Sequence, residues 1–212
     1  MSTQTAASTP PDEQRLGFKP EPGVGTPLAV GTFGFSVLML GIPNSGLITA
    51  DAAAAFTAVA FGTGAFGLLI GGLMEFRANN VFGGSFALFY SAFLLTTALM
   101  LRFLAAEMGP AFAAAFGTWL LLWCAFTFML SWGAWYINMP AFLAFILLAV
   151  GYLFFGLANF VNSPGLTNIL STAGGWVLIV DGLVAWYLAW ALAVNPMVGD
   201  KLPLWPHPYR TR

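Results

Sequence analysis

The sequence predicts an all-α integral membrane protein whose protomer crosses the bilayer six times. Hydrophobic residues make up 59% of the chain and charged residues only 7%, whereas a soluble domain carries about 25% charged residues. Each of six apolar runs reaches the roughly 20 residues that span the hydrocarbon core as a helix. The runs lack the alternating polarity of transmembrane β-strands. Helices are therefore expected, because they satisfy their own backbone hydrogen bonds within lipid.

Short polar or Gly/Pro breaks set the bounds of the expected helices, which are about 27–47, 51–74, 84–104, 110–135, 140–160 and 167–194. Pro27 suits a first helical turn, and Asp51 is expected to cap the second span. Asn195-Pro196 is expected to end the sixth. Residues 1–24 are polar and rich in Ser, Thr and Pro, which predicts a disordered tail. This divides the chain into a tail (1–24), a six-helix transport domain (25–197) and a C-terminal tail (198–212).

The placement of basic residues predicts the orientation in the membrane. With six spans, both termini lie on one side, and that side carries most of the cations: Arg15, Lys19, Arg77, Lys201, Arg210 and Arg212. The opposite side carries Arg102. Because short cytoplasmic segments are enriched in Lys and Arg, both termini are expected to be cytoplasmic.

Small residues recur at four-residue spacing along the second span. Gly67 and Gly71 form a GxxxG pair, and Ala54, Ala58 and Gly62 are expected to extend one small face on the same helix. Such faces allow close approach of helices. Packing within the protomer is the favoured interpretation, and a contact between protomers is the alternative.

The residues that carry most enzyme and cofactor chemistry are scarce. The chain has one Cys, Cys124, and one His, His207, in a Pro-rich tail. This excludes a His/Cys metal centre and leaves no catalytic triad, so neither an enzyme nor a metal or other cofactor is expected. A net charge of −1 also gives no indication of nucleic-acid binding.

Two acidic residues interrupt the apolar runs. Glu75 closes the second run beside Arg77, and we interpret it first as a solvated helix end paired with that arginine. Asp181 lies in the middle of the sixth run. An ionised carboxylate there is costly, so it must face a polar cavity, meet a donor or be protonated. Asp181 is either a functional acid or a structural acid satisfied between helices. Both acids are candidates for proton coupling.

The centres of the runs contain no Lys or Arg. An anionic substrate would therefore be held by amides, hydroxyls and helix N-termini, which favours the weak binding that conduction requires. The candidate polar groups are Asn44, Ser45, Ser85, Tyr90, Thr96, Thr97, Asn159 and Asn162.

Several segments together resemble the acetate uptake transporters, also called the succinate–acetate permease family. They are residues 26–35 (TPLAVGTFGF), 44–46 (NSG), 71–76 (GGLMEF), 80–83 (NVFG) and 89–93 (FYSAF), with LW at 122–123, FT at 126–127, GGW at 174–176 and YLA at 187–189. The family signature Asn-Pro-Ala-Pro-Leu-Gly-Leu is altered at its start, where this chain has Val24-Gly25-Thr26.

The resemblance implies a hexamer in the plasma or inner membrane, with one pathway in each protomer. It places an apolar constriction at Phe33, Tyr90 and Leu148. It also places pathway positions at Pro27, Leu28, Asn44, Asn159 and Ala185.

The expected function is a transporter or channel for acetate and related small carboxylates. A conduit for ammonia or another small solute is an alternative, since the spans have no central cation. A non-transporting membrane subunit is a third hypothesis, disfavoured because both tails are short.

Overall fold

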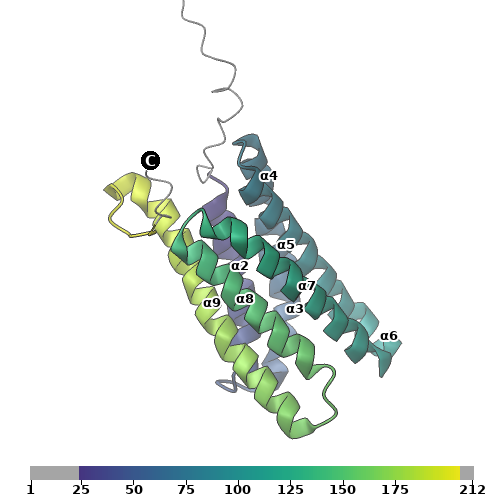
Figure 1. The fold of residues 1–212 in the computed structure, drawn as a ribbon. Coiled ribbons are helices and arrows are strands. Elements are labelled where there is room, and N and C mark those ends of the chain that lie inside the picture. The colour runs from purple at the N-terminus through teal and green to yellow at the C-terminus, as the bar shows by residue number, and fades with distance from the viewer. Residues whose placement is uncertain (1–23, 206–212) are drawn as a thin grey trace, which may run out of the picture.

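The computed structural model describes residues 24–205 and arranges six long helical spans side by side in one bundle (Figure 1). By length and composition, all six of these spans are able to cross a membrane. The first span is α2 (Thr26–Asn44). The second contains α3 (Ala55–Val59) and α4 (Phe66–Arg77), and the third contains α5 (Val81–Leu99) and α6 (Ala105–Met108). The last three are α7 (Ala111–Trp135), α8 (Met139–Ala158) and α9 (Pro164–Val198). The predicted all-helical fold class is confirmed.

The sequence predicted some of the helix starts correctly and others wrongly. Pro27 occupies the first turn of α2, as predicted. The second span begins with a 3₁₀ turn, Ala50–Ala54, that follows Thr49, so Asp51 lies inside the first turn and the predicted cap at Asp51 is wrong. Asn80 and Asn138 cap α5 and α8 through their side-chain oxygens, which accept from backbone N–H groups three residues later.

The second span does not present one continuous small face. A π-helical segment, Ala60–Ala65, interrupts it, and the wider π turn rotates the following residues relative to those before it. Gly67 and Gly71 are buried against α2, where a Cβ added to Gly71 would meet Gly25 O and the Ala29 side chain. Gly62 instead has open space around it. The expectation of a shared face is therefore wrong, whereas the GxxxG pair does pack within the protomer.

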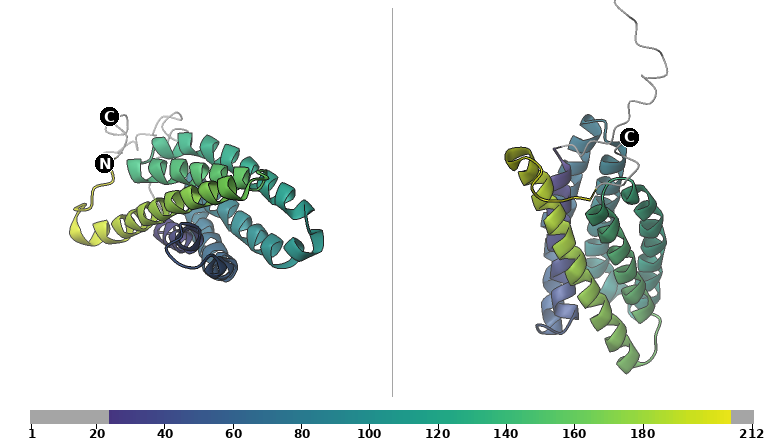
Figure 2. Two further views of the ribbon diagram at one scale, coloured as in Figure 1. Left: turned by 90° about the horizontal axis from the view of Figure 1, so that it is seen from below. Right: turned by 60° about the vertical axis from the view of Figure 1, so that its left-hand side comes forward.

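The packing order places α2 and α8 inside the bundle. α2 packs along α9 and α4, and α8 packs between α7 and α9. The end-on view in Figure 2 shows α9 lying across the bundle beside both α2 and α8. All six spans contribute buried residues to one shared core.

The sixth span continues past the predicted stop at Asn195-Pro196. α9 ends instead at Val198, where Gly199 adopts the left-handed conformation (φ 76°) that commonly follows a helix. The Asn195 side chain accepts from Leu202 N (2.9 Å) and donates to Leu202 O (2.8 Å). This pairing folds the described part of the C-terminal segment back onto the bundle, where Met139 N donates to Leu204 O at 3.3 Å.

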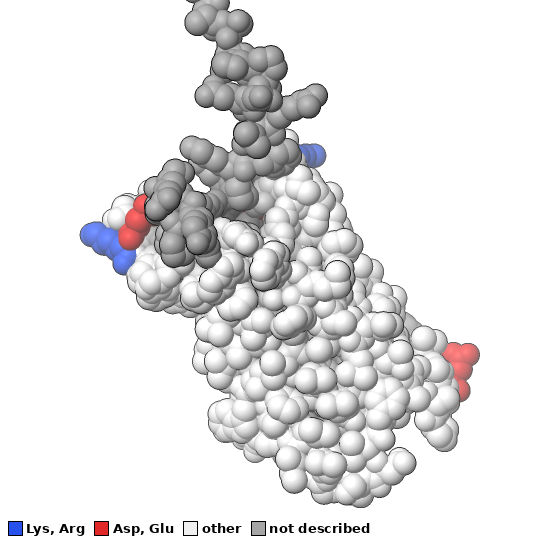
Figure 3. All heavy atoms as spheres, in the orientation of Figure 1, with Lys and Arg blue, Asp and Glu red and all other residues white. Residues whose placement is uncertain are grey.

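Among the described residues, the exposed charged side chains lie at the ends of the spans. The flank shown in Figure 3 is uncharged between its two ends. Figure 2 shows that α2 begins and α9 ends at the same end of the bundle, and Arg77 and Lys201 belong to that end while Arg102 lies at the other. The predicted contributions of Arg15, Lys19, Arg210 and Arg212, as well as His207 and the tail over 1–23, lie outside the described residues.

Candidate functional site

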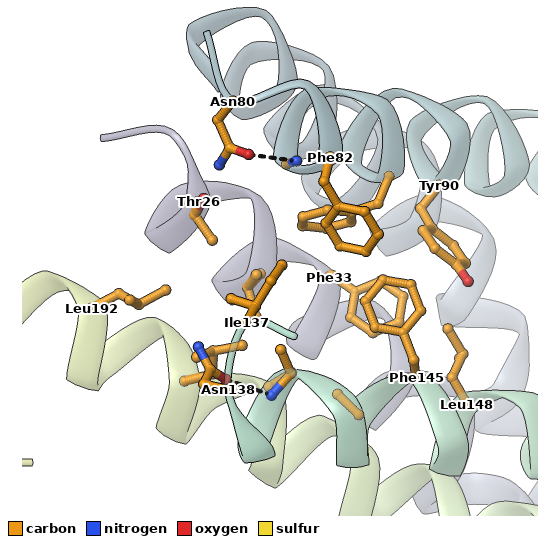
Figure 4. Close-up of a pocket in the computed structure, with 17 residues that line it drawn as sticks. Thr26, Phe33, Asn80, Phe82, Tyr90, Ile137, Asn138, Phe145, Leu148 and Leu192 are labelled. Carbon is orange, nitrogen blue, oxygen red and sulfur yellow. Dashed lines mark hydrogen bonds between the residues drawn. The ribbon is translucent and has the colours of Figure 1, made fainter. Parts of the chain in front are cut away.

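A cavity opens among the first turns of three helices. It offers about 70 Å³ to water-sized molecules. Its lining residues come from α2, α5, α8 and α9 and the turns before them (Figure 4): Thr26, Val30, Phe33, Asn80, Phe82, Gly83, Phe86, Tyr90, Ile137, Asn138, Ala141, Ala144, Phe145, Leu148, Ala185, Leu188 and Leu192. We call it the N-terminal cavity, because it lies at the end where α2, α5 and α8 begin.

Three polar residues stand at the outer part of this cavity, its mouth, and the rest of the lining is mostly apolar. Thr26, Asn80 and Asn138 stand at the starts of α2, α5 and α8. Each start carries a partial positive charge from the helix dipole, and the carboxylate of the buried Glu75 compensates the charges at the starts of α2 and α5. The Thr26 hydroxyl is buried and has no hydrogen-bond partner among the described residues. The groups left to attract a small anion are the start of α8 and the Thr26 hydroxyl.

Glu75 organises the mouth from behind. It is fully buried, its Oε1 accepts from Thr26 N at 2.5 Å, and its Oε2 accepts from Asn80 Nδ2 at 2.6 Å. The expectation of a solvated helix end is wrong, because the final turn of α4 points this carboxylate inward against the starts of α2 and α5. Glu75 thus fixes two of the three polar positions at the mouth.

The inner end of the cavity is apolar and tightly packed. The structure brings Phe33, Tyr90 and Leu148 together here, and their exposed fractions are 7%, 2% and 2%. The rings of Phe33 and Tyr90 meet edge to face with centroids 5.7 Å apart. The Tyr90 hydroxyl is hydrogen-bonded to Thr127 Oγ1 at 2.7 Å, which ties the ring to α7.

A second cavity lies toward the opposite end of the bundle and offers about 510 Å³ to water-sized molecules. Asn44 and Asn159 line it, as do Thr97 and the exposed Arg102. Of the pathway positions expected from the sequence, Asn44 and Asn159 face this cavity and Ala185 faces the N-terminal cavity. Pro27 and Leu28 line neither cavity; Leu28 is 40% exposed on the outside of α2.

The two cavities are separated by a partition about one to two helical turns thick. Along α2, Phe33 lines the N-terminal cavity and Val37 lines the second. Along α8 the corresponding pair is Leu148 and Tyr152. Because each pair is four residues apart, the closed layer is about 6 Å deep along α2 and α8. Along α9 the flanking residues are Leu178 and Ala185, seven residues apart, so the layer there is about 10 Å deep. Opening this layer would join the cavities into one route along the bundle.

Asp181 lies inside the partition. On the buried face of α9, Leu178 lines the second cavity and Ala185 lines the N-terminal cavity. Asp181 stands between them, is fully buried, and neither carboxyl oxygen has a partner among the described residues. The sequence hypothesis of an acid satisfied between helices is therefore not supported. The Tyr152 hydroxyl, also buried, has no partner among these residues either.

Some lining residues were not singled out from the sequence as site residues. Asn80 and Asn138 carry the N-cap signal of an Asn shortly before an apolar run, which marks a helix start but not a cavity. Arg102 was noted only for orientation. Nothing in the local sequence indicates that its side chain borders a cavity.

Comparison with known proteins shows the family. The model of the GPR1/FUN34/yaaH family matches residues 16–198. The succinate-acetate/proton symporter SatP of Escherichia coli is 28% identical over 174 residues, covering 82% of this chain and 89% of that protein. The fold is similar to the structure of the bacterial acetate channel SatP, with a TM-score of 0.74 and 25% identity over 85% of this chain and 97% of that one.

Longer fungal proteins are also similar. The ammonia transport outward protein 2 of Saccharomyces cerevisiae is 34% identical over 129 residues, and this alignment covers 58% of the chain but only 44% of the yeast protein. Acetate permease A of Emericella nidulans is 29% identical over 182 residues, covering 78% of the chain and 59% of that permease. The chain therefore spans less than half the length of the yeast relative. The resemblance seen in the sequence motifs is confirmed, and this multi-pass membrane protein belongs to the GPR1/FUN34/yaaH family.

Proposed function

We propose that the protein conducts acetate and related small carboxylates across the membrane through a route within each protomer. The observation that carries this proposal is a pair of cavities toward opposite ends of one bundle, separated only by a thin partition. The names of two relatives, the succinate-acetate/proton symporter and the acetate permease, supply the substrate class.

The N-terminal cavity has the properties that a carboxylate requires. The N-terminus of α8 attracts its negative charge, and the Thr26 hydroxyl and the Asn138 amide lie where they can donate hydrogen bonds to it. The absence of a cation among the residues lining this cavity keeps binding weak, which allows rapid release. At the other end, Arg102 raises the local concentration of anions near the second cavity.

The partition acts as the barrier to free flow. Phe33, Tyr90 and Leu148 form an apolar layer that excludes water when closed, as hydrophobic constrictions do. The Phe33 and Tyr90 rings meet edge to face in this layer, and opening it requires at least one of the two rings to rotate away from the other. The bond from Tyr90 to Thr127 favours the closed position.

The proposal includes an assembly and an orientation. Six protomers form a hexamer in the plasma membrane, as the family resemblance implies, and both termini face the cytoplasm because Arg77 and Lys201 lie at that end. Protease accessibility of a tag at each terminus in sealed vesicles tests the orientation. Crosslinking of the purified protein in native-like lipid tests the number of protomers.

The function is tested by reconstituted flux. Purified protein in liposomes is expected to accelerate uptake of labelled acetate above the rate of protein-free liposomes of the same lipid. Excess unlabelled succinate or lactate in competition defines the substrate range. Uptake equal to that of protein-free liposomes would remove the proposal.

Ammonia is a second candidate substrate, because one relative is named an ammonia transport outward protein. An acid in the partition is also more compatible with a neutral or cationic solute than with an anion. Ammonium that competes with acetate uptake, or that moves while acetate does not, would favour this function.

A further inference from the structure

We infer that Asp181 is a proton-transfer residue within the partition, so that each carboxylate crosses together with one proton. This inference rests on the proposed function and assigns a role to a residue of this chain. Its basis is geometric: a fully buried acid with two unpartnered oxygens stands between two cavities, on the helix face that lines both.

The position of Asp181 in the partition is incompatible with the passage of an anion while Asp181 is ionised. An ionised Asp181 would repel a carboxylate at the narrowest part of the route, with no neighbouring donor among the described residues to compensate its charge. A protonated Asp181 removes the repulsion and presents an O–H donor to the same carboxylate. Asp181 therefore allows an anion to pass only while the Asp181 carboxyl group itself is protonated.

The surroundings contain few groups that could replace it. α2 has no titratable side chain, α8 has only Tyr152, and α5 has only Tyr90, whose hydroxyl is engaged by Thr127. Both tyrosines lie within electrostatic reach of Asp181. The titratable groups of α7 and α9, besides Asp181, are Cys124, which is half-buried, and Tyr187, which donates to Pro203 O. On α4 they are Glu75 and Arg77, and Glu75 is bound to Thr26 and Asn80.

The proton transfer balances as follows. A hydronium ion in one cavity gives a proton to an oxygen of ionised Asp181 and becomes water. The carboxyl O–H then donates to a carboxylate that enters the partition; the Asp181 O–H bond breaks and a substrate O–H bond forms. The neutral acid leaves for the other cavity and releases its proton to water there, and Asp181 takes up the next proton. One anion and one proton have moved, with no net charge.

Electrical potential separates coupled from uncoupled flow. Proteoliposomes carrying a lumenal pH dye receive a gradient of labelled acetate at equal pH, with the potential set by potassium and valinomycin, and protein-free liposomes supply the background. A potential of 100 mV biases the crossing of one whole charge by about 50-fold at equilibrium. We expect the wild type to take up acetate at a rate independent of the potential and to acidify the lumen.

Asp181→Asn keeps the shape of the side chain and removes the titratable carboxyl group. We expect uptake in this variant to become strongly dependent on potential, with no lumenal acidification above background. Asp181→Glu should retain coupled uptake, and it keeps the inference testable where Asp181→Asn loses all uptake. Glu107→Gln, the same chemical change at an exposed acid near the other end of the bundle, is the matched control and should behave as wild type.

The outcomes are distinct. Coupled uptake that persists in Asp181→Asn, or potential-dependent uptake without acidification in the wild type, overturns the role of Asp181 while acetate transport stands. Loss of uptake in both Asp181→Asn and Asp181→Glu, with normal gel-filtration profiles, assigns a structural role and also overturns it. Absence of uptake in the wild type removes the proposed function itself.

Discussion

The contact between Glu75 and the starts of α2 and α5 leads to a quantitative prediction for Glu75→Gln. In the native protein the carboxylate accepts from Thr26 N at 2.5 Å and from Asn80 Nδ2 at 2.6 Å. A hydrogen bond to a charged group contributes about 1.5–3 kcal/mol, against about 0.5–1.5 kcal/mol for a neutral one. Loss of the charge therefore removes about 1 kcal/mol from a bond that persists.

The amide adds a second cost. One carboxylate oxygen becomes an NH₂ group that faces the N–H of Thr26 or of Asn80, so one buried donor loses its acceptor at about 1–3 kcal/mol. We expect Glu75→Gln to lower the free energy of unfolding by about 2–4 kcal/mol in total at this fully buried site. About 1 kcal/mol comes from the one bond that survives in weakened form, and about 1–3 kcal/mol from the donor that loses its acceptor.

The assay is reversible unfolding in mixed detergent micelles, followed by tryptophan fluorescence. A double-mutant cycle with Asn80→Ala should give a coupling energy of about 0.5–3 kcal/mol, because the two side chains share a bond. Glu107→Gln serves as the control for loss of a negative charge at an exposed position. A change below about 0.5 kcal/mol for Glu75→Gln would refute the reasoning, because that is the size of an ordinary surface substitution.

Three further predictions concern packing, the cavity and charge. Gly71→Ala should destabilise the protein by about 1–3 kcal/mol in the same assay, because the new methyl group meets Gly25 O at 2.7 Å. Gly62→Ala is the control, and it should be neutral or slightly stabilising because Gly62 has open space around it. Ala185→Leu should abolish labelled acetate uptake by filling the N-terminal cavity, and Ala193→Leu on the exposed face of α9 should leave uptake unchanged; equal uptake in both would contradict the assigned route. Arg102→Gln should reduce acetate uptake several-fold at low ionic strength and little at about 1 M salt, where charges are screened beyond about 3 Å; a loss independent of salt would exclude steering.

The sequence predicted the six spans and the family because both depend on local information. Apolar length alone indicates a membrane helix, and the motifs around Phe33 and Tyr90 are contiguous in the chain. The trio Phe33, Tyr90 and Leu148 could therefore be expected, and the structure brings its members to one cavity.

Features that depend on contacts between spans were predicted poorly. Glu75 stands next to Arg77 in the sequence, which indicates a solvated helix end, yet the turn of α4 directs it toward Thr26, 49 residues away. The small face of the second span was misjudged for a related reason. The π-helical turn at Ala60–Ala65 rotates its two halves apart, and its effect on packing is not readable from spacing.

The amino-acid sequence alone was sufficient to establish a multi-pass helical protein with a rare acid, Asp181, in its last span, since hydrophobicity and charge are properties of the residues themselves. Only the tertiary structure showed that this acid stands between two cavities without a partner among the described residues. The physical reason is that burial and hydrogen bonding of Asp181 are set by which residues of α2, α5 and α8 surround it, and those neighbours are brought together only when the helices pack.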